Sequence, residues 1–276
     1  MDRSTVRVLT LNCWNLSEPI AERIALIRAG IESLQPDLIG LQEIIVRADG
    51  LDEGALILDG LGYQRIFGPA FHWTDAGTAQ PTDPGAHAFG NLIASRWPLR
   101  HHEVQALPGS ETHEYRCALG ALVDAPFGSI PFVTTHLNWK FHHGNIRERQ
   151  VVALAEFTNR LAKGAGFQPI LVGDMNAEPD SNEIRFLAGL AALEGRSTYF
   201  QDAWRVAGDG PGFTWDNRNR FAAIMFEPNR RIDYIFVGLA NMHARGRIDA
   251  VRLVLDEPQG DVFPSDHFGL LADIRI

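Results

Sequence analysis

Hydrophobic and polar positions follow two different periods along the chain, which indicates a fold that mixes strands and helices. Residues 6–12 alternate with the period of a half-buried strand. In the segment behind Pro19, aliphatic residues recur three or four positions apart: Ile20, Ile24, Ile27, Ile31 and Leu34. That spacing predicts an amphipathic helix, and the stretch QPDLIGLQE then predicts a strand that ends at Glu43. Strand, helix and strand with short connections predict a sheet covered by helices.

Similar patterns continue to the C-terminus. Further strands are expected over residues 91–95, 118–124, 131–136, 169–173, 231–237 and 270–276. Residues 145–163 are helical by composition. A second helix is expected over residues 181–190, capped by Asp180 with Glu183 at the capping-box spacing.

Two stretches, residues 68–90 and 208–231, are rich in Gly, Pro and Asn and show no periodicity. Long loops of this kind in a compact domain often carry function. Strands and helices mix over the whole length, without a linker, a repeat or a low-complexity tract. Residues 1–276 are therefore expected to form one domain built on two packed sheets.

Composition limits the classes of protein to consider. Hydrophobic residues make up 45% of the chain and charged residues 21%, an ordinary globular mixture. The 25 basic and 34 acidic residues give a net charge of −9, which argues against tight nonspecific binding to nucleic acid but leaves a local basic groove open. The N-terminus lacks a signal-peptide core, no apolar run approaches the ~20 residues of a membrane span, and Cys13 and Cys117 are interpreted as buried thiols. A cytoplasmic protein without stable membrane insertion is expected.

Polar residues recur where the expected strands end. They are Asn12, Glu43, His136, Asn138, Asp174, Asn176, Asp233, Asp266 and His267. In α/β sheets, strand ends are where a site collects groups from distant parts of the sequence. Hard oxygen ligands such as Glu43 and Asp266 suit Mg²⁺, Mn²⁺ or Ca²⁺ better than Zn²⁺, and two histidines suit phosphate contact and proton handling. The combination predicts metal-assisted hydrolysis of a phosphate ester.

Each of these residues also has a plain structural interpretation when it is taken alone. Asn12 could cap a turn, and Glu43 could end a solvated strand. His136 could be a hydrogen-bonded core histidine, and Asp266 could be a loop acid. Their coincidence in this order favours a functional site.

Six segments carry a resemblance to the endonuclease/exonuclease/phosphatase superfamily: LTLNCWN, LIGLQEI, FVTTHLNW, ILVGDMNAEPDS, RRIDYIFV and FPSDHFGLLADI. They run from residue 9 to the end of the chain. That superfamily includes deoxyribonuclease I-like nucleases, abasic-site endonucleases, deadenylases, inositol polyphosphate phosphatases and neutral sphingomyelinases. The resemblance implies a deoxyribonuclease I-like α/β fold, a four-layer sandwich of two packed mixed β-sheets flanked by helices, with the site at one edge.

The resemblance also implies a metal site. Glu43 is similar to the principal metal ligand of the family, with Asn12 beside it. Asp266 would complete or support this ligand set. The implied cofactor is Mg²⁺ or Mn²⁺.

Roles in catalysis follow from the same resemblance. Asp174 is expected to orient and deprotonate the attacking water, and Asn176 to hold that water or a phosphate oxygen. His267 is expected to donate to the scissile phosphate, with Asp233 hydrogen-bonded to it and favouring its imidazolium form. His136 is expected to be another phosphate donor or to hand a proton to the leaving oxygen.

Weaker candidates for substrate contact carry open alternatives. Asn91 and Arg116 match positions where relatives carry phosphate-facing groups, and Asn138 follows the His136 strand end; each could equally be structural. Trp215 could stack on a substrate as part of the 208–231 stretch.

Charged residues outside the strand ends are candidates of the same kind. Arg218 and Arg220 could clamp a substrate beside Trp215, or they could simply pack the loop. Arg147 and Gln150 resemble a pattern in the deadenylase-like branch. The sequence does not decide between these readings.

The chain is expected to be a metal-dependent phosphodiester hydrolase whose partner is a phosphate-ester substrate. A nuclease or nucleotide phosphodiesterase ranks first, and a sphingomyelinase-like lipid phosphodiesterase or a small-molecule phosphatase ranks second, although no apolar membrane-docking hairpin is recognisable. A non-catalytic binding protein on the same fold would lack the equivalents of Glu43, Asp174 or His267, and none is lost. No protein partner can be inferred.

Overall fold

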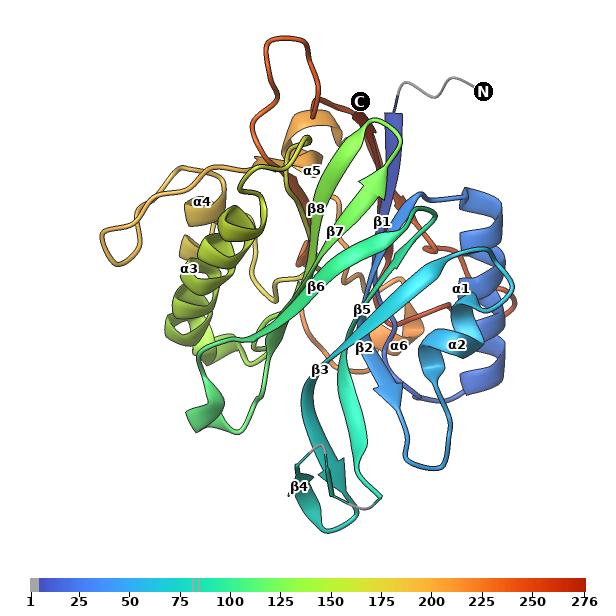
Figure 1. The fold of residues 1–276 in the computed structure, drawn as a ribbon. Helices are drawn as coiled ribbons and strands as arrows, with labels where there is room; N and C mark the ends of the chain where they lie inside the picture. The colour runs from blue at the N-terminus through green and yellow to red at the C-terminus, as the bar shows by residue number, and fades with distance from the viewer. Residues whose placement is uncertain (1–4, 81, 84) are drawn as a thin grey trace.

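The computed structural model describes residues 5–80, 82–83 and 85–276, and the strands in this part of the chain form two mixed sheets (Figure 1). The seven-stranded sheet has the order β12 (Ile248–Val254), β13 (Gly269–Arg275), β1 (Thr5–Asn12), β2 (Leu38–Val46), β5 (His87–Ser95), β3 (Gln64–Thr74) and β4 (Gly77–Ala79). The six-stranded sheet has the order β10 (Gln201–Asp202), β11 (Asp233–Val237), β9 (Ile170–Asp174), β8 (Gly128–His136), β7 (Cys117–Ala125) and β6 (Leu99–Ala106).

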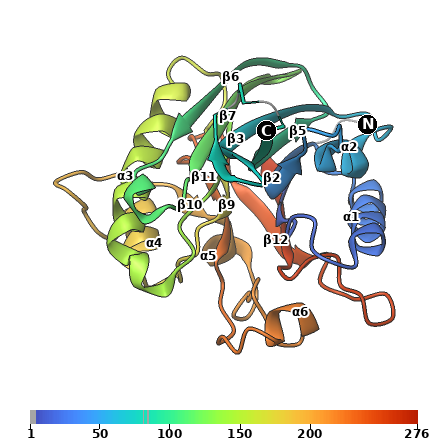
Figure 2. The same cartoon turned by 90° about the horizontal axis from the view of Figure 1, so that it is seen from below.

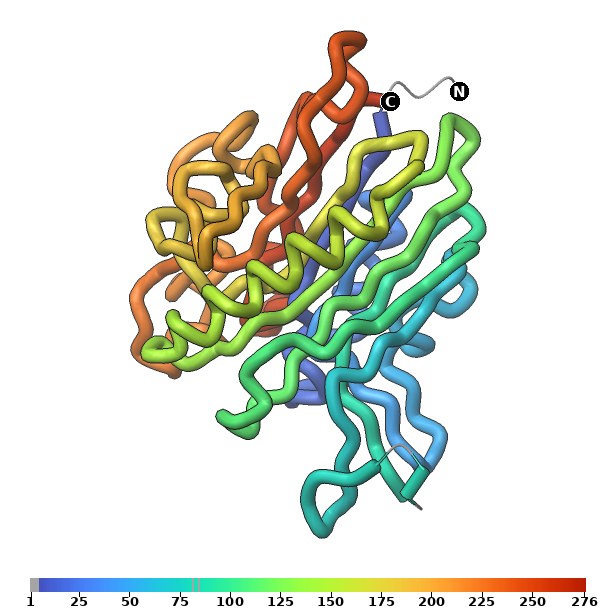
Figure 3. The backbone as a smooth tube through the Cα atoms, turned by 60° about the vertical axis from the view of Figure 1, so that its left-hand side comes forward, coloured from blue at the N-terminus to red at the C-terminus, as the bar shows by residue number. Residues whose placement is uncertain are grey.

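Helices cover the outer faces of both sheets, as Figure 2 shows from below. The helices in the described part of the chain are α1 (Ile20–Leu34), α2 (Glu53–Leu58), α3 (Gly144–Leu161), α4 (Asn182–Leu187), α5 (Ala203–Ala207) and α6 (Arg220–Ala223). The short α5 packs against both β11 and β12, and its Ala203 is buried in the core between the sheets. The helices α1 and α2 lie outside the first sheet, and α3 and α4 lie outside the second, where α3 packs along β7 and β8 (Figure 3). The expected four-layer α/β sandwich is confirmed.

The main hydrophobic core lies between the two sheets. Phe132 on β8, Val172 on β9 and Ile235 on β11 are buried there against residues of β1 and β13. The whole of β9 and the whole of β11 are buried, because a sheet covered on one face by helices and on the other by a second sheet leaves no polar side. This explains why a continuous apolar run precedes the polar strand ends.

Strand register brings the expected site residues to one edge. The parallel pair β8–β9 places His136 opposite Asp174, and the antiparallel pair β9–β11 places Asp174 opposite Asp233. In the other sheet, the parallel pair β1–β2 places Asn12 opposite Gln42, next to Glu43. Neighbouring strand ends therefore present these polar groups side by side.

The stretch 68–90 is not the irregular loop that its composition suggested. The strand β3 runs through its first part and pairs with β4 and β5, forming an arm at the bottom of Figure 1; residues 81 and 84 lie outside the described part. Phe71 packs on Phe89 with ring centroids 5.4 Å apart, and the register shifts between Pro69 and Phe71. The shift accommodates the proline, and cross-strand aromatic pairs hold the strands together.

Several other boundaries differ from the expectation. The helix cap is Ser181 and not Asp180, because the Ser181 hydroxyl accepts the Ile184 N–H at 3.4 Å, and α4 ends at Leu187. Glu183 does not reach back to the cap but accepts a hydrogen bond from Arg147 Nε at 2.9 Å. The strands β6 and β12 were not expected at all.

Two further observations concern the rest of the chain. Cys13 and Cys117 are free, buried thiols, as expected. Across the described residues, no helix combines the length and the apolar character that crossing a bilayer requires.

Candidate active site

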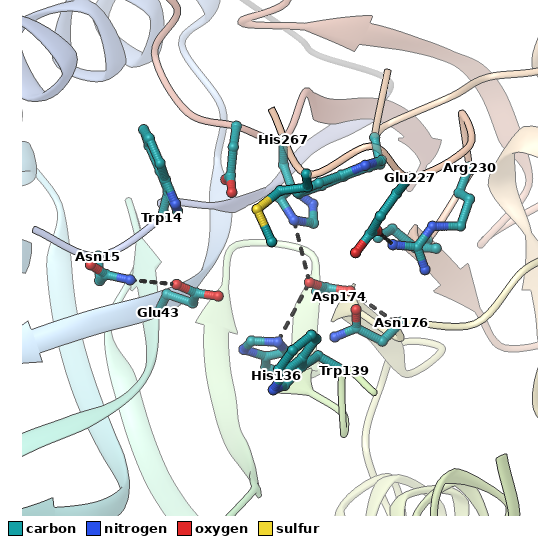
Figure 4. A pocket seen from close by; sticks show the side chains of 14 residues that line it. Trp14, Asn15, Glu43, His136, Trp139, Asp174, Asn176, Glu227, Arg230 and His267 are labelled. Atoms are coloured by element: carbon teal, nitrogen blue, oxygen red, sulfur yellow. Dashed lines mark hydrogen bonds and ion pairs between the residues drawn. The ribbon is translucent and has the colours of Figure 1, made fainter. Parts of the chain in front are cut away.

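A pocket of about 270 Å³ opens at the edge where the strand ends meet (Figure 4). Its lining mixes acids, histidines and large apolar side chains: Trp14, Asn15, Glu43, His136, Trp139, Asp174, Asn176, Trp215, Met225, Glu227, Arg230, Ile232, Asp266 and His267. Most of the polar groups expected from the sequence therefore converge on one cavity.

A bulge in β2 aims Glu43 at the pocket. The pairing of β2 with β5 shifts register between Leu41 and Ile44, and Glu43 has a left-handed backbone with φ 60°. The preceding Gln42 stays buried between the sheets and donates a hydrogen bond to the Thr134 hydroxyl at 2.9 Å. The strand thus continues past Glu43 to Val46, and the expectation that it ends at Glu43 is wrong.

Asn12 connects the two carboxylates of the site. Its amide nitrogen donates to Asp174 Oδ2 at 3.0 Å and to Glu43 Oε1 at 3.2 Å. Asn15 donates to the other Glu43 oxygen at 2.8 Å, while the Asn12 side-chain oxygen accepts the Trp14 N–H at 3.0 Å. In this arrangement Asn12 aligns Glu43 and Asp174 with its amide group.

The environment of Asp174 makes its carboxylate a base. Burial raises the pKa of Asp174 to about 6, and the nearby Asp233 charge adds to this, while His267 and the Asn12 amide oppose it. The Asn176 N–H donates to Asp174 Oδ1 at 2.9 Å, which leaves Oδ2 facing the histidines. At neutral pH the group is ionised and more basic than an exposed aspartate, as general-base catalysis requires.

His267 is held as an imidazolium by the acids around it. Its Nδ1 lies 2.9 Å from Asp233 Oδ2, and its Nε2 lies 3.8 Å from Asp174 Oδ2. Burial alone would lower the pKa of His267, but Asp233 and Asp174 outweigh it and raise the pKa to about 10. The Trp215 ring packs edge-on against this imidazole with centroids 5.0 Å apart. A buried positive charge therefore stands at the wall of the pocket.

His136, in contrast to His267, is neutral. Its Nδ1 lies 3.2 Å from Arg116 Nη1, and because a guanidinium only donates, Nδ1 must accept and the ring proton sits on Nε2. Burial, Arg116 and His267 together hold the pKa of His136 well below its usual 6.5. The neutral ring points its Nε2–H into the pocket, 3.5 Å from Asp174 Oδ2.

Glu43 and Asp266 form a donor set that fits a hard divalent cation. Burial raises the pKa of Asp266 to about 7, opposed by His267, and the negative charge of Glu43 raises it further. Within the described residues, neither carboxylate forms an ion pair with lysine or arginine. Two acids that repel each other in one pocket and pair with no lysine or arginine suit Mg²⁺ or Mn²⁺.

A second group of potential ligands is less suited to a metal. One atom each from Asp174, Asp233 and His267 lie within 4.8 Å of one another. His267 already fills the space between the two carboxylates, with one ring nitrogen directed at each. Because its pKa is about 10, this cluster holds a proton at neutral pH, which competes with metal coordination.

The residues expected from the sequence divide into three sets by position. The pocket lining contains Glu43, His136, Asp174, Asn176, Trp215, Asp266 and His267. Directly behind them, and hydrogen-bonded to them, lie Asn12, Arg116 and Asp233. The third set lies outside the pocket.

Two candidates for substrate contact belong to this third set. Asn91 is buried and donates to the Cys117 carbonyl at 3.0 Å. Asn138 donates to the Thr112 hydroxyl at 3.1 Å and is held by Gln150. Their polar groups are engaged in structural hydrogen bonds.

The candidate arginines also lie outside the pocket. Arg218 pairs with Asp256 at 3.0 Å, and the Arg220 side chain is largely exposed. Arg147 is buried against Glu183 and the carbonyls of the loop before α3. The arginine of the 208–231 stretch that reaches the pocket is instead Arg230.

Sequence reasoning missed half of the lining. The residues are Trp14, Asn15, Trp139, Met225, Glu227, Arg230 and Ile232. Trp14, Asn15 and Trp139 lie within or next to segments that carry the family resemblance, and the others lie in or directly after the 208–231 stretch. The sequence indicated the segments that contain these residues. An aperiodic loop, however, has no pattern that predicts which of its side chains point into the pocket.

The sequence resembles known proteins over most of its length. A family model described as the Endonuclease/Exonuclease/phosphatase family matches residues 9–267. Nocturnin from Rattus norvegicus is 25% identical over 260 residues, which cover 91% of this chain and 58% of the relative, so the chain spans little more than half the length of that relative.

Solved structures show the same fold. TDP2 from D. rerio, complexed with a single strand DNA product, has a TM-score of 0.75 at 20% identity and covers 99% of this chain and 100% of its own. An endonuclease/exonuclease/phosphatase from Beutenbergia cavernae has a TM-score of 0.71 at 23% identity, covering 99% of this chain and 72% of its own. The deoxyribonuclease I-like architecture expected from the sequence is confirmed.

Proposed function

Because the chain belongs to the endonuclease/exonuclease/phosphatase family, whose members are generally hydrolases of phosphoester bonds, we propose that it hydrolyses a phosphodiester with water activated by Asp174. The observation that carries this proposal is the row His136, Asp174 and His267, in which one buried carboxylate lies within 3.8 Å of a ring nitrogen of each histidine. The arrangement offers a base and two donors in a single pocket.

Asp174 has the properties of the general base. Its Oδ1 is occupied by the Asn176 N–H, so Oδ2 is the atom that accepts a proton from water. Asn12 donates to Oδ2 and fixes its direction. Asn176 donates its amide to the Leu137 carbonyl at 3.2 Å, which leaves its side-chain oxygen to hold the water.

The histidines stabilise charge on phosphorus oxygens in two ways. His267 supplies a positive charge fixed by Asp233, and such preorganised charge in a buried site stabilises a transition state more than it would in water. His136 supplies a neutral N–H donor whose direction Arg116 sets. Giving up this proton would leave an anionic ring, so His136 acts as a donor and not as the acid for the leaving oxygen.

Glu43 and Asp266 would hold the metal, with Mg²⁺ or Mn²⁺ as the expected ion. When bound, such an ion supplies positive charge that weakens the repulsion between the phosphate and an incoming hydroxide. Asn12 and Asn15 orient Glu43 for this role, and the Ser265 hydroxyl donates to Asp266 at 3.2 Å.

Two substrate classes need to be separated. The likeness to TDP2 bound to a DNA product supports a nucleic-acid or nucleotide diester. A lipid head-group diester is supported by the apolar half of the pocket, where Trp14, Trp139 and Met225 face the acids, and by the net charge of −9.

The reaction class is tested with small substrates. Bis-p-nitrophenyl phosphate and p-nitrophenyl phosphate are compared in the presence of Mg²⁺, Mn²⁺ or a chelator. Diester cleavage that stops with chelator supports the proposal. Cleavage of the monoester alone would make the protein a phosphatase.

A further inference from the structure

Large apolar side chains stand exposed around the mouth of the pocket. They come from the loop after β8 and from the loop after α6, and we call them the apolar rim: Trp139, Phe141, Ile224, Met225 and Phe226. Their exposed fractions run from 47% for Trp139 to 94% for Phe226. Soluble proteins rarely expose contiguous apolar patches of this kind unless something binds there.

The two halves of the apolar rim are joined to each other and to the catalytic wall. The Arg230 guanidinium lies over the Phe141 ring at 4.5 Å and forms an ion pair with Glu227, the residue after Phe226. The same guanidinium lies 5.9 Å from the Trp215 ring, which packs on His267. The rim is therefore a fixed part of the site.

Only part of the rim lines the cavity. Trp139 and Met225 line the pocket, but Phe141, Ile224 and Phe226 do not. A group small enough to fit the cavity cannot touch these three residues. An occupant that covers them is therefore larger than the group that enters the pocket.

A second copy of this chain is not a suitable occupant of the apolar rim. Trp139 and Met225 belong both to the rim and to the pocket lining, so a protein seated on the rim would close the entrance. The occupant has to present the substrate itself. A nucleic-acid strand or a lipid surface would meet this condition.

The charged side chains near the rim distinguish between a nucleic-acid strand and a lipid surface. Close to the rim, Lys140 lies 3.7 Å from Glu114, Arg220 lies 3.9 Å from Asp261, and Arg230 is paired with Glu227. Each of these three cations faces an acid, and the chain carries a net charge of −9. A phosphate backbone requires a track of unpaired positive charge, which these three residues do not supply. Exposed aromatic and aliphatic side chains with balanced charges suit a zwitterionic bilayer surface, where indole rings favour the interface.

We propose that the apolar rim docks on a zwitterionic phospholipid surface and delivers a lipid head-group phosphodiester to the pocket. This inference rests on the proposed phosphodiester hydrolysis for its substrate class. The contact is made by two short loops held together by Arg230, so docking does not require an apolar membrane-docking hairpin. Insertion is shallow and reversible.

The test compares two double variants in binding to phosphatidylcholine vesicles, followed by cosedimentation. Ile224→Ser with Phe226→Ser removes apolar side chains from the rim. Leu239→Ser with Met242→Ser is the matched control, because these residues are 68% and 100% exposed in the loop after β11, beyond the strand end opposite the site. All four positions are exposed, and melting temperatures confirm that both proteins fold.

Wild type and the control are expected to bind the vesicles, and the rim variant to bind at least ~10-fold more weakly, the scale of losing a buried aromatic contact. Adding phosphatidylserine should weaken binding, since the protein is acidic. The proposal is overturned if wild type does not bind, or if both variants bind alike. It is also overturned if the rim variant loses affinity for a single-stranded oligodeoxynucleotide and not for vesicles.

Failure of the proposed function gives a different result. Vesicle binding that depends on the rim, without cleavage of any diester, would retain the docking surface and reject the hydrolase. Cleavage of bis-p-nitrophenyl phosphate without vesicle binding would retain the hydrolase and reject the docking surface.

Discussion

Arg116 places its guanidinium 3.2 Å from His136 Nδ1, and together with burial it holds this histidine in the neutral form with its proton on Nε2. The neighbouring His267 is instead held as a positively charged imidazolium by Asp233. The site therefore contains one neutral donor and one cationic donor, and the protein around each ring determines which is which.

Replacing Arg116 by Met should change the pKa and the tautomer of His136. Burial, the largest cause of the low pKa of His136, remains, but the positive charge of Arg116 is lost, so the pKa rises part of the way toward its usual 6.5, and either ring nitrogen can carry the proton. Ring NMR signals followed against pH report both changes. The matched control is Arg100→Met, which removes an exposed arginine paired with Asp124. A His136 ring that keeps both its pKa and its Nε2–H tautomer in Arg116→Met would contradict the role assigned to Arg116.

Replacing Asp233 by Asn should shift the alkaline limit of activity. Asp233 is the strongest influence that raises the pKa of His267 to about 10, against the effect of burial. The wild type keeps its imidazolium as pH rises toward 10, whereas the variant loses it at lower pH. At pH 8 the variant should be slower by roughly 10- to 100-fold, measured as kcat/KM against pH. Identical alkaline limbs would remove His267 as a cationic donor.

Replacing Glu43 by Gln should weaken Mg²⁺ binding by on the order of 10-fold or more, because one hard ligand charge is lost. Isothermal titration calorimetry measures this directly. Glu53→Gln is a suitable control, since burial raises the pKa of Glu53 to about 8 and the group is already mostly neutral at pH 7. Equal Mg²⁺ affinities in wild type and Glu43→Gln would place the metal elsewhere.

Glu53 itself should make stability depend on pH. It lies fully buried at the start of α2, one of its oxygens accepts the Ile45 N–H at 2.9 Å, and the other has no partner. Burial raises its pKa from 4.5 to about 8, so the folded chain holds a proton that the unfolded chain releases between these values. As the pH rises from 4.5 to about 8, the free energy of unfolding should therefore fall by up to about 1.4 kcal/mol per pH unit because of this group alone. Urea unfolding of Glu53→Gln should show a shallower slope, and an equal slope would mean that Glu53 titrates normally.

Much of the catalytic half of the site could be predicted from the sequence. Asp174 and Asp233 follow or begin continuous apolar runs, and a polar group at the end of a buried strand is recognisable without a structure. Glu43 is different, because its direction depends on a bulge and a left-handed backbone that no local pattern shows.

Apart from Trp215, the apolar residues of the site could not be predicted. Met225 and Phe226 look like ordinary loop residues, and their exposure depends on how α6 and Arg230 fix the loop. The arm formed by β3 was hidden for a similar reason, because its cross-strand aromatic pairs join residues distant in sequence. Tertiary pairing overrides local composition in both cases.

The central claim is that Asp174 activates water, and Asp174→Asn tests it most directly. Hydrolysis of bis-p-nitrophenyl phosphate is measured at saturating Mg²⁺ for wild type and variant, with melting temperatures recorded to establish that both are folded. The base is lost while the size and shape of the side chain are kept. One of the two oxygens that accept from Asn12 and Asn176 becomes an NH2 group, so one of these hydrogen bonds is lost and the melting temperature measures its cost. Turnover should fall by at least ~100-fold. A folded variant that turns over at near the wild-type rate would contradict the claim.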